Sequence, residues 1–330
     1  MRVLVVGGTR FVGRHLVEAA LSAGHEVTIF HRGRTGSELF PDVEHRLGDR
    51  NTDLSALADG EWDATIDTCA YVPRHVTSLA DALGTRGGQQ VLISSVSAYA
   101  QPKEANYRED APLLELDDPT VETVTNETYG GLKVLCERSA LAIHGDRALV
   151  VRPTYVIGPH DYSWRFPTWV RRIAAGGEVL APGPASDYSQ YIDARDMAGW
   201  IVSMLERDLG GVFHTVAPSA HFTWGEELET IASAVAPADT TLTWVDEGFL
   251  AAEDVDGTMF PLWSGGDDAR LLMSADPTAA FEAGLQPRSL HDTVVDTLAW
   301  IDEQPSPPSA ALTAQRESEL LGRWKSAARE

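Results

Sequence analysis

The chain begins with Val3-Leu4-Val5-Val6, followed directly by Gly7-Gly8-Thr9-Arg10-Phe11-Val12-Gly13. The apolar run is typical of a strand buried on both faces, and residues 11–23 then show helical spacing that stops at Gly24. A glycine turn between a strand and a helix lets backbone N–H groups approach a pyrophosphate, and the helix N-terminus favours its negative charge. The stretch therefore predicts a dinucleotide-binding turn, with a purely structural turn as the alternative.

Short apolar runs alternate with helical patterns through the rest of the first half. The predicted strands are 27–30, 43–47, 64–67, 91–94 and 148–151, and the predicted helices are 73–83 and 127–143. Alternation of strands and helices implies right-handed crossovers between parallel strands. The predicted fold class is therefore α/β, a doubly wound parallel sheet of the Rossmann type.

The second half has a less regular pattern. It contains one predicted strand over 212–217, a capping box from Thr223 to Glu226 that opens a helix, and an amphipathic helix over 289–302. We expect a smaller C-terminal substrate lobe that is interleaved with the Rossmann strands. The predicted boundaries are 1–155 for the dinucleotide-binding domain, 156–303 for the substrate-binding lobe, and 304–330 for a linker and a peripheral helix.

The composition argues against several classes of partner. Among 330 residues, 49 are Asp or Glu and 26 are Lys or Arg, which gives a formal net charge of −23. Such an acidic chain argues against nucleic acid and anionic membranes, and no apolar segment is long enough to span a bilayer. Cys69 and Cys136 are the only cysteines, which excludes a disulfide framework and favours a reducing, cytoplasmic compartment. His160 and His214 have no further ligands spaced with them, so no metal site is predicted.

The end of the second predicted strand bears on the choice of cofactor. An acidic side chain there would accept hydrogen bonds from the ribose 2′-hydroxyl of NAD. The sequence instead runs Phe30-His31-Arg32-Gly33-Arg34, with no carboxylate and with two arginines that suit a 2′-phosphate. This chemistry favours NADP over NAD, while a solvated basic loop is the alternative reading of the arginines.

A tyrosine and a lysine in a predicted helix have the spacing of a catalytic pair. Tyr129 and Lys133 are four residues apart, which places both side chains on one helix face. A phenol with a pKa of about 10 is a poor base at neutral pH, and a neighbouring ammonium favours its ionised form. A hydroxyl at the end of a preceding strand would complete the set, and Ser94, Ser95 and Ser97 supply candidates.

These motifs resemble the short-chain dehydrogenase/reductase superfamily in its extended or atypical branch, which includes NAD-dependent epimerases and dehydratases and an isoflavone-reductase-like bacterial subgroup. The resemblance runs from the N-terminus to about residue 300 and includes Glu137 in the pattern Y-x-x-x-K-x-x-x-E, together with the segments 152–159 and 190–198. It implies that Tyr129 exchanges the proton on the substrate oxygen, that Ser95 hydrogen-bonds this oxygen, and that Lys133 binds the nicotinamide ribose.

Two positions depart from the family pattern. Arg10 stands where the family has the middle glycine of its turn, and its guanidinium could reach a cofactor phosphate. Ser189 stands where an arginine often grips a nucleotide-sugar diphosphate. The second departure weakens the interpretation of the chain as an enzyme acting on nucleotide sugars.

The resemblance also implies a set of site residues. The predicted cofactor-binding residues are Gly7, Thr9, Arg10, Phe11, Val12, Gly13, His31, Arg32, Arg34, Asp49, Arg50, Cys69, Ala70, Lys133, Pro153 and Thr154. The predicted substrate contacts are Ser97, Tyr155, Arg165 and Tyr191. The aromatic residues of the second half fit either a pocket for an aromatic substrate or ordinary core packing: Trp164, Phe166, Trp169, Tyr188, Tyr191, Trp224 and Trp263.

Three functions fit these features. The leading hypothesis is an oxidoreductase that transfers hydride between NADP, or alternatively NAD, and a small carbonyl or alcohol substrate. The second is an epimerase of sugars or nucleotide sugars that retains its NAD. The third is a non-catalytic relative that binds a cofactor or RNA, which the net charge opposes. Relatives commonly form homodimers, and here such a contact would use the predicted helix 73–83 and the helix of Tyr129.

Overall fold

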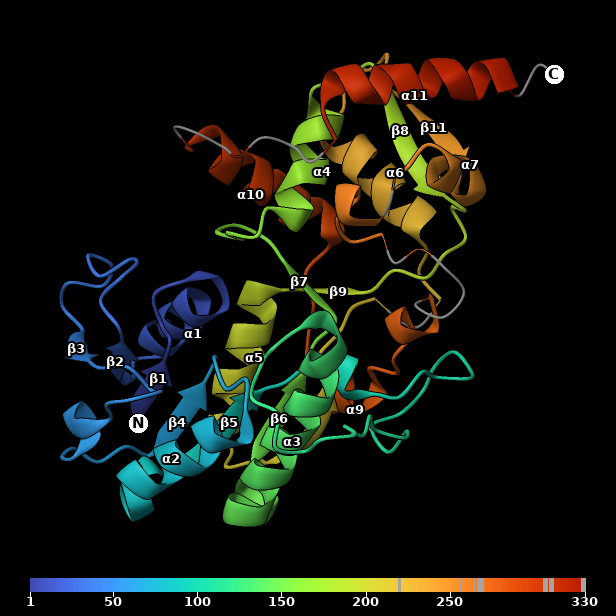
Figure 1. Cartoon of the computed structure of the whole chain (residues 1–330). Helices are drawn as coiled ribbons and strands as arrows, with labels where there is room; N and C mark the ends of the chain where they lie inside the picture. The colour runs from blue at the N-terminus through green and yellow to red at the C-terminus, as the bar shows by residue number, and fades with distance from the viewer. Residues whose placement is uncertain are drawn as a thin grey trace.

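The larger lobe of the protein is built on a seven-stranded sheet with the strand order β10-β6-β5-β4-β1-β2-β3 (Figure 1). The computed structural model describes residues 1–218, 221–255, 257–263, 265, 270–304, 308 and 312–327. The strands of this sheet are β1 (Arg2–Val6), β2 (Glu26–His31), β3 (Glu44–Leu47), β4 (Ala64–Asp67), β5 (Gln89–Ile93), β6 (Leu149–Arg152) and β10 (Gly211–His214). All of its strand pairs are parallel, so the predicted doubly wound α/β fold is confirmed.

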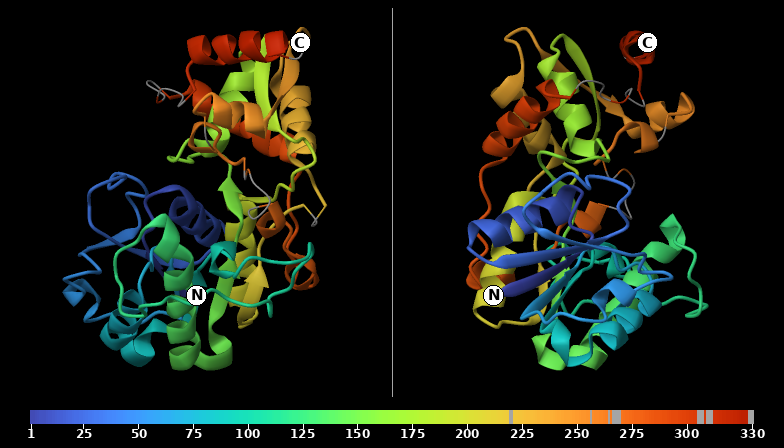
Figure 2. Two further views of the ribbon diagram at one scale, coloured as in Figure 1. Left: turned by 45° about the vertical axis from the view of Figure 1, so that its right-hand side comes forward. Right: turned by 90° about the vertical axis from the view of Figure 1, so that its left-hand side faces the viewer.

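Helices cover both faces of this sheet (Figure 2). They are α1 (Phe11–Ser22) and α5 (Ala194–Glu206) on one face, and α2 (Pro73–Leu83) and α3 (Asn126–His144) on the other. The alternation of side chains along β1 explains why the strand has no polar residue after Arg2. Val3 and Val5 pack into the core on the side of α1 and α5, whereas Leu4 and Val6 pack on the side of α2.

The smaller lobe is built on the parallel strands β8 (Glu178–Gly183) and β11 (Thr241–Asp246). Around them lie α4 (Arg165–Ala174), α6 (Trp224–Val235), α7 (Glu247–Ala252), α10 (Leu290–Asp302) and α11 (Ala314–Ala327). A second parallel pair, β7 (Tyr155–Ile157) and β9 (Tyr191–Asp193), lies between the lobes (Figure 1). The chain then returns to the larger lobe through α5 and β10, and again through α9 (Thr278–Glu282), which packs against β10.

Most aromatic residues of the second half form the core of the smaller lobe. Five of the seven named above are at most 8% exposed: Phe166, Trp169, Tyr191, Trp224 and Trp263. Trp169 and Trp224 pack edge to face with ring centroids 5.1 Å apart. Core packing therefore accounts for these side chains, rather than the lining of a substrate pocket.

Two predicted segments differ from the observed ones. The strand predicted over 212–217 ends at His214, because the chain then leaves the sheet and Ala217 exchanges backbone hydrogen bonds with Tyr191 of β9. Pro305, Ser306, Pro307 and Ser309 of the predicted linker lie outside the described residues. The helix after them, α11, buries Leu320 and Leu321 in the core of the smaller lobe. Among the described residues, no helix combines the length and the apolar character that crossing a membrane requires.

Candidate active site

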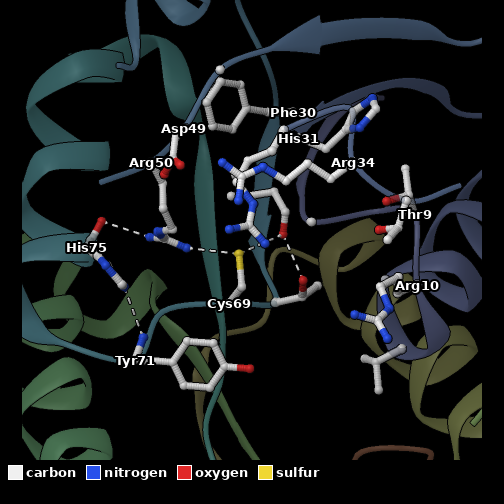
Figure 3. Close-up of a pocket in the computed structure, with 18 of the residues that line it drawn as sticks. Thr9, Arg10, Phe30, His31, Arg34, Asp49, Arg50, Cys69, Tyr71 and His75 are labelled. Atoms are coloured by element: carbon white, nitrogen blue, oxygen red, sulfur yellow. Dashed lines mark hydrogen bonds between the residues drawn. The ribbon is translucent and has the colours of Figure 1, made fainter. Parts of the chain in front are cut away.

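A cavity of about 410 Å³ lies at the carboxyl ends of β1 to β4, the place where open parallel sheets bind their ligands (Figure 3). Twelve of the predicted cofactor residues line it: Gly7, Thr9, Arg10, Phe11, Val12, Gly13, His31, Arg32, Arg34, Asp49, Arg50 and Cys69. Nine further residues of its wall were not predicted: Val6, Phe30, Thr35, Gly48, Asn51, Thr68, Tyr71, His75 and Tyr162. Most of these follow a strand within a few residues of a predicted contact, but Tyr162 comes from a loop after β7.

The glycine turn leaves its backbone open to the cavity. Gly7 has a φ of +93°, and a Cβ atom at this position would lie 2.5 Å from Oγ1 of Thr68. Only glycine adopts this backbone conformation without strain, and only glycine fits against Thr68. The bare backbone of the turn and the N-terminus of α1 thus form a surface that suits a pyrophosphate.

The side chain of Arg10 extends from the turn toward the smaller lobe. Arg10 precedes α1 with an extended backbone, at φ −140° and ψ 140°. Its guanidinium carbon lies 3.6 Å from the centroid of the Tyr162 ring, a close cation–π contact. A guanidinium held at the side of the turn can still reach a phosphate. Tyr162, from the loop after β7, lines the same cavity.

Two arginines of the loop after β2 are not engaged by any direct contact in the described part of the chain. Within the described part of the chain, neither Arg32 nor Arg34 forms an ion pair or a hydrogen bond, and both are exposed at the cavity. Asp49 lies opposite them, after β3. Hydrogen bonds from Asn51 lower the pKa of Asp49, and the charges of Arg32 and Arg34 lower it further. These three side chains thus converge on one end of the cavity.

Arg50 lies at the cavity wall, but another group of the protein already engages its charge. Its two terminal nitrogens donate to the buried carboxylate of Asp67 at 2.6 and 2.7 Å. The same nitrogens reach the sulfur of Cys69 at 3.2 Å and the backbone oxygen of His75 at 2.9 Å. The pair therefore ties the segment after β3 to the end of β4, beneath the cavity floor.

Tyr129 and Lys133 lie on one face of α3, next to Tyr71 from the segment after β4. The rings of Tyr129 and Tyr71 have centroids 6.5 Å apart, and Nζ of Lys133 lies 5.5 Å from the centroid of Tyr71. Lys133 is buried and donates to the backbone oxygens of Ala70 at 2.8 Å and Ile93 at 2.6 Å. These bonds use two of its three N–H donors and fix the ammonium between the ends of β4 and β5.

The predicted serine segment packs directly against α3. A Cβ atom at Gly130 would lie 2.0 Å from the backbone oxygen of Ser97, so glycine beside Tyr129 permits this close approach. Ser95 precedes a short 3₁₀ turn, accepts from the backbone N–H of Ser97 at 3.1 Å, and donates to its hydroxyl at 3.1 Å. Ser94 points the other way, into the protein, and donates to the carboxylate of Glu137.

A buried polar network lies behind the serine segment. The carboxylate of Glu137, on α3, accepts two hydrogen bonds from Arg152, at 3.0 and 2.6 Å. Arg152 also donates to the hydroxyl of Tyr99, which lies 2.6 Å from Nε2 of His214 at the end of β10. The network thus joins the helix of Tyr129 to the ends of β6 and β10.

Other predicted contacts lie away from this cavity. Ala70, Lys133, Pro153 and Thr154 do not line it, although the buried hydroxyl of Thr154 has no hydrogen-bond partner in the described part of the chain. Such an orphaned hydroxyl suits a ligand group. Of the predicted substrate contacts, Tyr191 is 7% exposed, and Arg165 donates to Ser163 at 3.1 Å. The structure does not bring these two together with the cavity of Figure 3.

A buried carboxyl in the smaller lobe predicts an unusual dependence of stability on pH. Glu227 of α6 is 1% exposed, and the hydroxyl of Ser189 donates to its carboxylate. Burial raises the pKa of Glu227 from 4.5 to about 7. Folding therefore favours the protonated form, and this contribution to stability is lost as the pH rises through 7. We expect Glu227→Gln to raise the free energy of unfolding by about 2–3 kcal/mol at pH 8, and by less at pH 5.

Urea unfolding at both pH values measures this effect. Glu229→Gln is the matched control, because Glu229 is exposed on the same helix. Its unfolding free energy should differ from that of the wild type by less than about 0.5 kcal/mol at either pH. If the Glu227→Gln variant were less stable than the wild type at pH 8, the ionised, buried carboxylate of Glu227 would not destabilise the folded protein, and the prediction would be wrong.

The chain belongs to the NAD dependent epimerase/dehydratase family, whose model matches residues 3–216. The predicted membership of the extended short-chain dehydrogenase/reductase branch is thereby confirmed. The human Epimerase family protein SDR39U1 is 29% identical over 252 residues, which cover 71% of this chain and 80% of that protein. The Arabidopsis thaliana Chloroplast stem-loop binding protein of 41 kDa b is 26% identical over 220 residues, which cover 62% of this chain and 55% of that protein.

Solved structures of the same fold include proteins with bound nicotinamide cofactors. Human SDR39U1 (isoform 2) with NADPH superposes with a TM-score of 0.64 at 22% identity, over 91% of this chain and 99% of that one. UDP-glucuronic acid 4-epimerase from Bacillus cereus with NAD superposes with a TM-score of 0.66 at 18% identity, over 92% and 99%. At these identities the likeness concerns the fold.

Proposed function

We propose that this protein is an NADP-dependent oxidoreductase that transfers hydride between the cofactor and a small carbonyl or alcohol substrate. The observation that carries the proposal is the pair Arg32 and Arg34, which is exposed at the cavity and unpaired in the described part of the chain. No carboxylate stands beside them at the end of β2 to hold the 2′-hydroxyl of NAD. A 2′-phosphate would accept charge-assisted hydrogen bonds from both guanidinium groups.

The remaining residues of the cavity fit the other parts of a dinucleotide. The open backbone of Gly7 and the N-terminus of α1 would hold the pyrophosphate, with Arg10 beside it. Asp49 would contact the adenosine. Lys133 and Thr154 would hold the nicotinamide end, since each has a polar group to offer to a ligand. NADPH in the structure of human SDR39U1 supports this choice of cofactor, and NAD in other neighbours is the alternative.

The proposed catalytic residues are Ser95, Tyr129 and Lys133. When bound, the nicotinamide supplies or accepts the hydride. Tyr129 would donate the proton to the substrate oxygen in reduction and take it back in oxidation. Lys133, one helical turn after Tyr129 and fixed by two backbone oxygens, would hold the nicotinamide ribose with its remaining N–H. Ser95 would turn its hydroxyl from Ser97 to the substrate oxygen.

One specific observation supports each of two alternative functions. Several neighbours in fold are epimerases, and one of them is a complex with NAD. Ser189, buried against Glu227, does not offer the cation that a nucleotide-sugar diphosphate would need. The similarity to a stem-loop binding protein suggests RNA binding as a third function, but a net charge of −23 disfavours it. A cytoplasmic location and a homodimer through α2 and α3 stay predictions.

Binding and turnover measurements test the proposal. The purified protein would be titrated with NADPH and NADH by cofactor fluorescence, and then assayed for NADPH oxidation with a panel of aldehydes and ketones. We expect tighter binding of NADPH and oxidation with at least one carbonyl. Tightly retained NAD with no net oxidation would favour the epimerase, and absence of binding to either cofactor would contradict the proposal.

Removal of the two arginines should abolish the preference for NADPH. The double variant Arg32→Ala/Arg34→Ala should raise the Kd for NADPH by about 100-fold, because two charge-assisted contacts to the 2′-phosphate are lost. The Kd for NADH should change by less than about twofold. The control variant Arg2→Ala/Arg147→Ala removes the same charge from exposed positions, where side chains are 47% and 62% exposed. Equal losses for both cofactors, or an equal loss in the control, would contradict a 2′-phosphate site.

A further inference from the structure

Two histidines form a bonded pair directly behind the basic turn. His31 is the last residue of β2, and His45 lies on β3. His45 is paired with Ile29, two residues before His31, so both histidine side chains lie on the same face of the sheet. Nε2 of His31 lies 2.8 Å from Nδ1 of His45, with ring centroids 4.9 Å apart. His31 is 7% exposed and belongs to the cavity wall next to Arg34 (Figure 3).

The neighbours of the two rings fix which nitrogen carries each proton. The backbone N–H of Gly33 donates to Nδ1 of His31 at 3.2 Å, so this nitrogen is unprotonated. The proton of neutral His31 is then on Nε2, which donates to Nδ1 of His45. The proton of neutral His45 is in turn on its Nε2, which donates to the backbone oxygen of Phe40 at 3.2 Å. The chain of hydrogen bonds from Gly33 to Phe40 is complete only when both rings are neutral.

The start of this chain lies at the centre of the basic turn. Gly33 stands between Arg32 and Arg34 and has a φ of +68°, so the backbone turns at this residue. Among the residues that the structure describes, its N–H is the one group of the turn that a side chain of the sheet binds. The direction in which the two guanidinium groups leave the backbone therefore depends on His31, and the orientation of His31 depends on His45.

We propose that His31 and His45 are positioning residues, which hold Arg32 and Arg34 in the geometry that selects a 2′-phosphate over a 2′-hydroxyl. This inference rests on the proposed function, since it assumes that the two arginines bind NADP. The chain of hydrogen bonds from Gly33 to Phe40, the relay, orders the turn before the cofactor binds. Less conformational entropy is then lost when both arginines engage the cofactor. It acts on the 2′-phosphate, whereas the glycine turn contacts the pyrophosphate, which NADH and NADPH share.

Protonation of either ring breaks the relay. An added proton must occupy an Nδ1 that now accepts, so two N–H groups would face each other. Arg32 and Arg34 follow His31 on the turn, and Asp49 follows β3. Glu44 and Arg46 flank His45 on β3, but their side chains point to the other face of the sheet, where Arg46 lies over the ring of Trp62. The Glu44 carboxylate is engaged by Thr28 and Arg46. Burial first, and then the neighbouring His45, lower the pKa of His31 below its ordinary value, so protonation of His31 opens the relay only when the pH falls below the usual range of a histidine.

The test compares the wild type with His45→Phe and His45→Asn. Each protein would be titrated with NADPH and NADH by cofactor fluorescence at pH 7.5 and pH 5.5. At pH 7.5 we expect His45→Phe to raise the Kd for NADPH by about tenfold and to leave the Kd for NADH within about twofold. His45→Asn should recover most of this loss, because its amide oxygen replaces the Nδ1 acceptor for His31.

The pH dependence separates positioning from a merely structural role. The preference of the wild type for NADPH should fall from pH 7.5 to 5.5 more steeply than that of His45→Phe, since protonation of the 2′-phosphate is common to both proteins. A preference that rises in the wild type would overturn the inference, because the histidines would then act as added charge. Parallel losses for NADH and NADPH, or no loss, would overturn it as well. A wild type without any preference for NADPH would instead overturn the proposed cofactor, and the inference with it.

Discussion

Tyr129→Phe should lower kcat for carbonyl reduction by about 10²–10⁴-fold, which is the range expected when a general acid is removed. The phenylalanine ring keeps the packing of Tyr129 beside Tyr71, whose ring centroid lies 6.5 Å away. Only the hydroxyl that would give its proton to the substrate oxygen is lost. The Kd for NADPH should stay within about twofold, because Lys133 remains fixed by Ala70 and Ile93.

Tyr71→Phe is the matched control for this measurement. Tyr71 lies beside both Tyr129 and Lys133, and loss of solvent raises its pKa to about 12, with a further contribution from Tyr129. Such a phenol is a poor proton donor or acceptor at neutral pH, so kcat should fall by less than about tenfold. Steady-state NADPH oxidation with the best carbonyl of the panel gives both values. A large loss in Tyr71→Phe with normal turnover in Tyr129→Phe would reassign the acid to Tyr71.

Those parts of the site that lie within short, continuous runs of residues could be predicted from the sequence. The turn at Gly7, the strand ends and the basic loop after β2 each follow from a short run of residues, and parallel strands necessarily bring their carboxyl ends to one edge. Tyr162 could not be found in this way, because its place at the cavity depends on how the smaller lobe packs on the larger one. The contact between Arg10 and Tyr162 joins residues that are distant in sequence and share no motif.

The hydrogen-bond partners of individual side chains could not be predicted from local sequence patterns either. Arg50 fits a cofactor contact by its position after β3, but its terminal nitrogens bond to Asp67, which arrives from β4. The pairing of His31 with His45 depends on the register of β2 and β3, which neither strand specifies alone. The aromatic residues of the second half fitted two interpretations equally, and only the packing of α4 against α6 decided in favour of the core.

Arg152→Met should destabilise the protein by about 3–5 kcal/mol, the usual cost of leaving one partner of a buried ion pair uncompensated. The side chains of Arg152 and Glu137 are 4% and 2% exposed, and two hydrogen bonds join them. Methionine fills most of the space but leaves the carboxylate of Glu137, within the described residues, with the hydrogen bond from Ser94 only. Since Glu137 lies one turn after Lys133 on α3, the loss falls on the helix that carries the proposed catalytic pair.

A double-variant cycle separates the pair from the packing around it. Glu137→Gln/Arg152→Met removes both charges, so its free energy of unfolding in urea should fall by clearly less than the sum of the two single losses. The exposed pair Arg147 and Asp208, with side chains 62% and 68% exposed, is the control, and Arg147→Met should cost less than about 1 kcal/mol. If Arg152→Met cost no more than Arg147→Met, the buried ion pair would not contribute to stability as proposed. The position of α3 would then not depend on this ion pair.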